Sequence, residues 1–176
     1  TYTVRWVDTA RRELAMDFVV HGDEGLAGPW ANSAQPGDVL TFGGPGGGFA
    51  PDPAADWYLF AADESALPAT AAALEVLADD AVGHAFIEVQ GPQDELPLKF
   101  PKGVVVTWLY RGENEPAGRL LVAALDALPF HPGEVQVFAH GSAGYGHNVF
   151  VEQSSDILHY SWNAAGQIQI VDVGIA

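Results

Sequence analysis

The sequence predicts a short antiparallel β segment followed by an α/β domain built on a parallel sheet. Residues 2–21 hold two strand-like runs around a polar turn. A proline- and alanine-rich stretch at 50–55, APDPAA, is interpreted as a linker. Beyond it, strand-like and helix-like runs alternate, which is typical of parallel sheets with crossover helices. We therefore expect two parts, at residues 1–50 and 51–176.

The composition excludes several classes of protein. The 176 residues are 48% hydrophobic and 17% charged, which is enough apolar content for a buried core. The absence of cysteine excludes disulfides, thiolate metal sites and a cysteine nucleophile. A net charge of −16 argues against nucleic acid and anionic lipid as partners. With no signal-peptide pattern and no run of roughly 18 apolar residues, we expect a cytoplasmic protein with no membrane contact.

The first part is expected to contain a hairpin, a short helix and one further strand. Tyr2–Val7 and Glu13–His21 predict the hairpin, because apolar residues alternate along the second run. Pro29 is favoured at the first position of a helix, so a helix is expected from there to Gln35. Asp38–Gly43 is predicted to be a strand.

The stretch from His21 to Gly48 combines glycine-containing turns with a helix start. Backbone N–H groups at such places bind phosphate, so the stretch predicts a nucleotide-like ligand. Gly43–Gly48 follows a strand but opens no helix, so it is not a dinucleotide fingerprint. A flexible connector is the alternative interpretation of that loop.

The second part begins with Trp57–Ala62, a continuous apolar run typical of a strand buried on both faces. An alanine-rich helix is expected at Ala66–Leu77. The tail from residue 142 onward differs, because it predicts three short strands separated by polar turns. Further strands are expected at Val82–Val89, Val104–Tyr110, Val135–His140, Asn148–Glu152, Ile157–Trp162 and Gln167–Val173, with a helix at Arg119–Leu128.

The carboxyl ends of parallel strands lie at one edge of a sheet, where ligands of α/β proteins bind. Here those ends carry Asp63-Glu64-Ser65, Glu88, Arg111 and His140-Gly141. Ser65 can donate a hydrogen bond to a ligand, cap the following helix, or do both. Gly141-Ser142-Ala143-Gly144 is one residue short of a serine-hydrolase elbow, which disfavours that chemistry.

Eight motifs occur in one order along about four-fifths of the chain: YTVR at 2–5, DFVVHG at 17–22, GLAGPWA at 25–31, GDVLTFGGPGG at 37–47, DWYLFAADESALPA at 56–69, AFIEV at 85–89, VTWLYRG at 106–112 and VFAHG at 137–141. With these motifs the chain resembles the siderophore-interacting proteins, flavin-dependent ferric-siderophore reductases related to the ferredoxin reductases. The resemblance implies a partial antiparallel β-barrel of the FAD-binding type, followed by an α/β parallel-sheet NAD(P)H-binding domain. The family's first barrel strands have no counterpart ahead of Tyr2, and the tail at 142–176 diverges from the family pattern.

The resemblance also implies the cofactor contacts. Tyr2 is expected to pack on the flavin, Thr3 to hydrogen-bond it, and Arg5 to pair with the diphosphate. The other interpretations remain open: an exposed arginine on an ordinary strand, a histidine bonded to backbone at position 21, and a core tryptophan at position 30. The remaining expected cofactor contacts are His21, Gly22, Ala27, Trp30 and Ala31 for FAD, and Gly44, Gly46, Asp63, Glu64, Ser65, His140 and Gly141 for the nicotinamide side.

The leading hypothesis is an FAD-dependent reductase that passes electrons from NAD(P)H to a ferric siderophore and releases Fe(II). No side chain is expected to act as acid or base, and no metal site is expected on the protein. NADPH carries a 2′-phosphate, which needs a cation in the binding site. Only Arg111 and Arg119 lie near suitable strand ends, and the sequence does not show whether either binds a phosphate, so both NADH and NADPH remain possible. Two other hypotheses are a non-catalytic module that binds a nucleotide or siderophore, and a fragment that needs a partner chain to complete the barrel.

Overall fold

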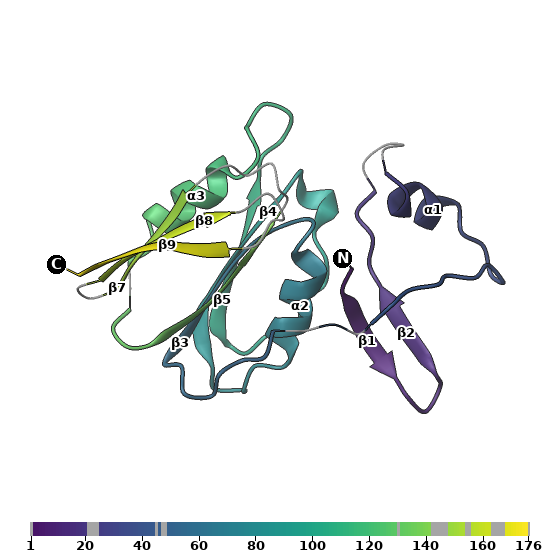
Figure 1. The fold of residues 1–176 in the computed structure, drawn as a ribbon, viewed down its shortest axis with the longest axis horizontal. Helices are drawn as coiled ribbons and strands as arrows, with labels where there is room; N and C mark the ends of the chain where they lie inside the picture. Colours follow the sequence, from purple (N-terminus) through teal and green to yellow (C-terminus); the bar gives the residue numbers. More distant parts are fainter. Residues whose placement is uncertain are drawn as a thin grey trace.

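The structure is a computed structural model. It describes residues 2–20, 25–44, 46, 49–129 and 131–141, and the backbone of residues 148–153, 156–162 and 168–175. Figure 1 shows a parallel sheet flanked by helices, with a separate hairpin and short helix beyond one of those helices.

The first part forms a two-stranded antiparallel hairpin, as predicted. Strand β1 (Val4–Asp8) pairs with β2 (Glu13–Met16). Asp8 stabilises the turn, because its Oδ1 accepts the backbone N–H groups of Ala10 and Arg11, both at 3.0 Å. The second strand is shorter than predicted, ending at Met16 rather than His21.

Two predictions in the first part were wrong. Helix α1 spans Ala27–Ser33, so it begins two residues before Pro29. Asp38–Gly43 is not a strand in the described part of the chain. A strand needs a neighbour for its backbone hydrogen bonds, and the only described pairing in this part joins β1 to β2. Val39 is accordingly 84% exposed.

The second part contains the predicted four-stranded parallel sheet, in the order β5-β4-β3-β6. Each of these four strands lies within one residue of its predicted bounds, and the parallel α/β part of the predicted fold is therefore confirmed. The elements are β3 (Trp57–Asp63), α2 (Leu67–Glu75), β4 (Val82–Val89), a 3₁₀ turn at Pro92–Asp94, β5 (Gly103–Tyr110), α3 (Arg119–Asp126) and β6 (Val135–His140).

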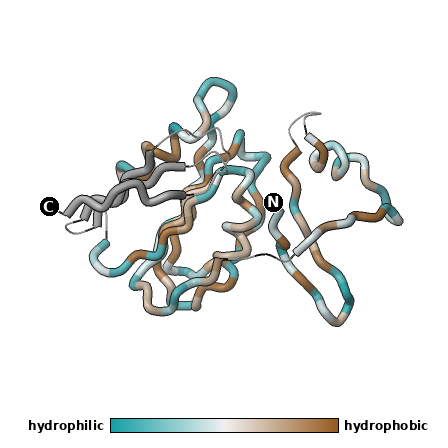
Figure 2. Tube along the Cα trace, viewed as in Figure 1, coloured by the Kyte–Doolittle hydropathy of each residue, from teal (hydrophilic) through white to brown (hydrophobic). Residues whose placement is uncertain are grey.

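Strand β3 is buried along its whole length, which its continuous apolar sequence predicted. Alternate side chains point to opposite faces. Trp57 and Leu59 pack with Leu121 and Leu125 of α3. Tyr58 and its neighbours on the other face pack with α2. Figure 2 shows the hydrophobic colouring concentrated along the strands of this sheet.

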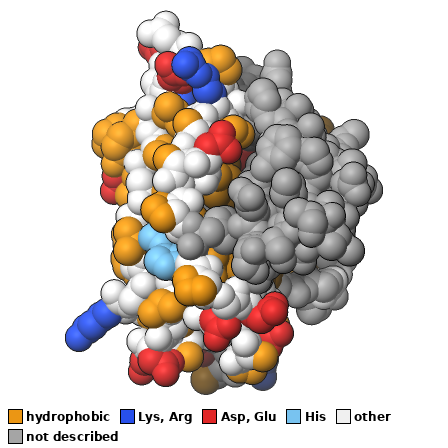
Figure 3. Space-filling view, turned by 90° about the vertical axis from the view of Figure 1, so that its left-hand side faces the viewer, with side chains coloured by type: hydrophobic (Ala, Val, Ile, Leu, Met, Phe, Trp, Pro, Cys, Tyr) orange, Lys and Arg blue, Asp and Glu red, His pale blue; other side chains and the backbone are white. Residues whose placement is uncertain are grey.

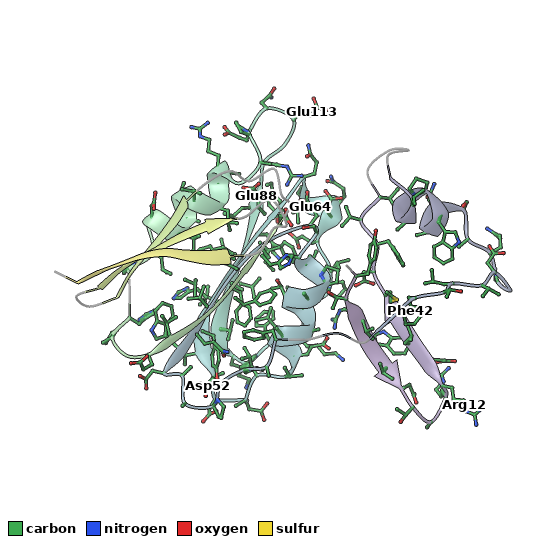
Figure 4. All side chains as sticks on the ribbon, in the orientation of Figure 1. Arg12, Phe42, Asp52, Glu64, Glu88 and Glu113 are labelled. Atoms are coloured by element: carbon green, nitrogen blue, oxygen red, sulfur yellow. The ribbon has the colours of Figure 1, made fainter. Side chains whose placement is uncertain are left out.

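The linker at residues 50–55 is fastened to the start of the sheet. The side-chain oxygen of Gln136 accepts the Asp52 N–H at 2.7 Å, and its amide nitrogen donates to the Ala50 carbonyl at 3.1 Å. The Tyr58 hydroxyl donates to the Asp52 carbonyl at 2.8 Å. The predicted linker is thus an ordered part of the α/β unit, and Figure 4 places Asp52 at its amino-terminal edge.

The tail forms a separate antiparallel sheet, in the order β7-β8-β9. The three strands are β7 (Asn148–Gln153), β8 (Asp156–Trp162) and β9 (Ile168–Ile175), which confirms the three predicted strands. Strand β7 lies next to α3.

A hollow of about 430 Å³ lies at the amino-terminal edge of the parallel sheet, lined in part by Trp57, His84 and His131. Figure 3 shows histidine side chains beside hydrophobic ones on one side of the molecule. The Nε2 atoms of His84 and His131 are 3.0 Å apart, so one imidazole donates to the other. Burial lowers the pKa of His84 below its ordinary value of 6.5, and His131 lowers it further.

This histidine pair predicts a pH dependence of stability. The folded state binds fewer protons at His84 than the unfolded state does. The free energy of unfolding should therefore fall as the pH drops below 6.5. Urea unfolding at about pH 7.5 and about pH 5.5 measures the change. His84→Gln should reduce the difference, whereas His140→Gln, at an exposed histidine, should preserve it. An equal pH dependence in wild type and His84→Gln would contradict the prediction.

Candidate functional site

The carboxyl edge of the parallel sheet holds the candidate site. Strand β3 is followed by α2 and β4 on one side, whereas β6 returns to its other side. The strand order therefore changes direction between β3 and β6, and α2 and α3 cover opposite faces there (Figure 1). Dinucleotides bind outside the carboxyl ends of strands at such a switch point.

Asp63 organises the end of β3. Its side chain is buried, and its Oδ1 accepts the Ser65 N–H at 2.8 Å, the Ser65 hydroxyl at 2.6 Å and the Ala66 N–H at 3.2 Å. The hypothesis that Ser65 caps α2 was wrong, because Asp63 accepts these N–H groups and the N-cap residue is Ala66. The Ser65 hydroxyl is hydrogen-bonded to Asp63, and Ser65 is nevertheless exposed to solvent.

Gly141 lies directly against Asp63, from the end of β6. A Cβ atom at Gly141 would stand 3.1 Å from Asp63 Oδ2, so the residue has little room for a side chain. The preceding His140 is exposed and pairs in register with Ala62. The structure thus brings together three predicted residues from two strands: Asp63, Ser65 and Gly141.

A charged network continues along the same edge. The guanidinium of Arg111 forks onto the Glu64 carboxylate, with Nη1 at 2.9 Å from Oε2 and Nη2 bonded to Oε1. Arg111 Nη1 also lies 3.7 Å from Glu88 Oε1. Figure 4 shows Glu64 and Glu88 at the same end of the sheet, with Glu113 on the loop beyond.

Glu88 is fully buried and holds the start of α3. It accepts the Gly118 N–H at 2.7 Å and the Leu121 N–H at 3.2 Å. Gly118 has a φ of +83°, a conformation that glycine adopts without strain. Glu88 was not among the site residues predicted from the sequence. The sequence feature that could have identified it is a carboxylate within the otherwise apolar run AFIEV, because a buried carboxylate needs a hydrogen-bonding partner.

Aromatic rings connect the predicted flavin contacts of the first part. Tyr2 contacts Phe18 with ring centroids 4.8 Å apart, and Phe18 contacts Trp30 at 6.0 Å. Tyr2 is 48% exposed, so the row ends in an accessible ring. Sequence reasoning missed Phe18, although the DFVVHG motif contains it. Thr3 is half-buried between Tyr2 and the start of β1.

Ala27 and Ala31 lie in α1, on either side of Trp30. The N-cap residue of α1, Leu26, makes no side-chain capping bond. Gly28 packs closely against the chain itself, because a Cβ there would stand 3.2 Å from the Val19 carbonyl oxygen. The predicted contacts His21 and Gly22 lie outside the described residues.

Arg5 binds a carboxylate from the second part of the chain. Its Nη1 and Nη2 donate to the two oxygens of Glu75, the last residue of α2, at 3.0 and 2.7 Å. This fork raises the pKa of Arg5 and holds the pKa of Glu75 below its ordinary value. Asp17 Oδ2 lies 4.0 Å from Arg5 Nε. The residue predicted to meet a diphosphate is thus paired with α2 in this structure.

Gly44 and Gly46 lie on the connector between the two parts. Both are exposed, and Gly44 has a φ of +127°. Phe49 ends this connector by packing edge-on against Phe60 and Phe138, with ring centroids 5.9 and 5.0 Å away. Phe49 therefore anchors the end of the connector on the face of the sheet that α2 covers.

Among the described residues, no three or more histidine, aspartate or glutamate side chains gather as metal ligands would. Helices in the described part of the chain are all too short or too polar to cross a bilayer.

Comparison with known proteins identifies the family. The model of the siderophore-interacting FAD-binding domain matches residues 1–49, and the siderophore-interacting protein model matches residues 55–149. The chain belongs to the siderophore-interacting protein family. The matched segments end before residue 150, so most of the tail sheet lies outside them.

Three relatives illustrate the match. Ferric vibriobactin reductase of Vibrio cholerae is 42% identical over 135 residues, covering 75% of this chain and 48% of that protein. The NADPH-dependent ferric-chelate reductase of Escherichia coli is 37% identical over 116 residues, covering 64% and 45%. The crystal structure of a siderophore utilization protein from T. fusca superimposes with a TM-score of 0.67 at 41% identity, covering 81% and 54%. The chain thus spans about half the length of the relatives it matches.

Removing the Glu88 carboxylate should destabilise the fold. Glu88→Ala leaves the buried N–H groups of Gly118 and Leu121 without their acceptor, at a cost of about 2–4 kcal/mol. Urea unfolding measures the loss. Glu113→Ala, at an exposed loop carboxylate, should change stability by less than about 0.5 kcal/mol. Equal effects of the two substitutions would show that the Glu88 bonds contribute little.

The Arg5–Glu75 pair should show measurable coupling. In a double-mutant cycle with Arg5→Gln and Glu75→Gln, unfolding should reveal about 0.5–1 kcal/mol at low salt, since both side chains are partly exposed. Because the pKa of Glu75 is lowered, the coupling should disappear as the pH falls below 4.5. The more exposed Arg11–Glu13 pair is the control and should couple less. Identical coupling in both pairs would contradict the prediction.

Proposed function

We propose that the chain takes part in flavin-dependent reduction of ferric siderophores by NAD(P)H, releasing Fe(II) for use in the cytoplasm. The proposal rests mainly on the order of the two parts along the chain. A segment matched to an FAD-binding domain precedes a parallel sheet whose switch point gathers Asp63, Ser65 and Gly141. The reductase names of the Vibrio and Escherichia relatives support the same reaction class.

Residues 1–50 are proposed to be part of an FAD-binding barrel. The accessible Tyr2 ring, backed by Phe18 and Trp30, offers an apolar face of the kind on which a planar ring packs. Arg5 provides a fork suited to phosphate once it leaves Glu75. The other proposed flavin contacts are Thr3, His21, Gly22, Ala27 and Ala31.

Residues 51–176 are proposed to form the NAD(P)H-binding domain. The hydroxyl of the exposed Ser65 donates its hydrogen to Asp63. The lone pairs of the Ser65 hydroxyl oxygen can then accept a hydrogen bond from a ligand. Gly141 keeps the edge beside Asp63 clear of side chains. Glu64 and His140 flank the same edge, and Gly44 and Gly46 are proposed to approach the nicotinamide from the connector.

The protein's contribution is to hold and orient. When bound, a flavin supplies the conversion between a two-electron donor and one-electron reduction of Fe(III). The siderophore is the substrate, and its hard oxygen ligands hold Fe(III) more tightly than Fe(II), so reduction loosens the metal. The residues at the switch point need only position the donor, because electron transfer requires no protein acid or base.

The hairpin part also supports a dependence on further barrel strands, from the same polypeptide or from a partner chain. Large apolar side chains there are exposed, including Trp6 at 49%, Val7 at 60% and Phe42 at 52%. Large apolar side chains exposed in such number are typical of a surface that another element covers. We therefore propose that flavin affinity rises when such strands are present.

Reconstitution tests the proposal. The purified chain is mixed with FAD, alone and with a partner carrying the first barrel strands of a relative, and its flavin spectrum is recorded. Anaerobic NADH or NADPH should bleach the bound flavin, and a ferric siderophore should restore the colour while an Fe(II) chelator reports released iron. If flavin binds but NADH and NADPH do not bleach it, with or without the partner, the non-catalytic module is favoured. If flavin does not bind with or without the partner, the reductase proposal is rejected.

A further inference from the structure

We infer that the dinucleotide site at the carboxyl edge selects NADH over NADPH, and that Glu64 sets this choice by occupying Arg111. This inference rests on the proposed function, because it concerns the same site. The two dinucleotides differ by one phosphate on the adenosine 2′-oxygen. A site that accepts this dianion needs a cation directed at it.

The edge offers two arginines, and both are paired with carboxylates. Arg111 forks onto Glu64, and Arg119 Nη1 lies 2.7 Å from Glu115 Oε2. The other basic residues lie elsewhere. Arg5, Arg11 and Arg12 belong to the hairpin, and Lys99 and Lys102 precede β5 at the opposite edge of the sheet.

The charge around Arg111 is negative before any ligand arrives. Glu64 and Glu88 both face its guanidinium, at 2.9 and 3.7 Å, so two carboxylates surround one cation. The Arg111 and Glu64 side chains are only 17% and 21% exposed, so solvent screens their charges incompletely. A 2′-phosphate must displace Glu64 to reach Arg111 and then lies beside a released carboxylate.

A 2′-hydroxyl meets the opposite situation. A carboxylate can accept a hydrogen bond from a ribose hydroxyl, as the acidic residue that recognises NAD in dinucleotide-binding folds does. Glu64 keeps lone pairs for this purpose while it holds Arg111, because each carboxylate oxygen accepts more than one hydrogen bond. The same pair therefore favours the hydroxyl and disfavours the phosphate.

Titration calorimetry of the full chain with NAD⁺ and NADP⁺ tests the inference without requiring turnover. NAD⁺ should bind at least about tenfold more tightly. Glu64→Gln weakens the hold on Arg111, which Glu88 still faces, and removes one negative charge. It should therefore lower the NAD⁺ preference by about tenfold, mainly through tighter NADP⁺ binding. Glu113→Gln makes the same change in net charge at an exposed position beyond the edge (Figure 4) and should leave the ratio unchanged.

Each outcome decides a separate point. Tighter binding of NADP⁺ by the wild-type chain overturns the inference but keeps the proposed function. Equal shifts in Glu64→Gln and Glu113→Gln overturn the role of Glu64, because net charge alone then explains the effect. Binding of neither dinucleotide by the folded chain overturns the proposed function, and the inference with it. The wild-type ratio gives a result even if Glu64→Gln fails to fold, which its thermal unfolding reveals.

Discussion

The burial of β3 on both faces is the constraint on which the rest of the α/β unit depends. Its seven residues are all buried, so each face needs a covering helix and each edge needs a neighbouring strand. Helix α2 covers one face and α3 the other. The chain must then cross from β5 back past β3 to reach β6, and this crossing creates the switch point at the carboxyl edge.

Two buried carboxylates at that edge act on the backbone. Asp63 accepts N–H groups just ahead of α2, and Glu88 accepts N–H groups at the start of α3. Each compensates the cost of burying its charge with hydrogen bonds that position a helix. Ser65 and Glu64 lie beside them and are less buried, and these are the neighbouring residues that we propose contact a ligand.

The first part depends on its partner elements more than on its own core. Its hairpin is a single pair of strands, and many of its apolar side chains are exposed. Its aromatic row packs within it, and the Arg5–Glu75 fork joins it to α2. A two-stranded hairpin is marginal alone, which is consistent with a chain that spans about half the length of its relatives.

The sequence by itself determined the parallel strands, the crossover helices, the three tail strands and the family, because apolar continuity, alternation and motifs are local properties. It placed Asp63, Ser65 and Gly141 at one edge for the same reason. Only the tertiary structure decided that Arg5 binds Glu75, 70 residues away, and that Glu88 holds a helix 30 residues later. It also decided that Asp38–Gly43 forms no strand, because pairing depends on a neighbour that no local pattern specifies.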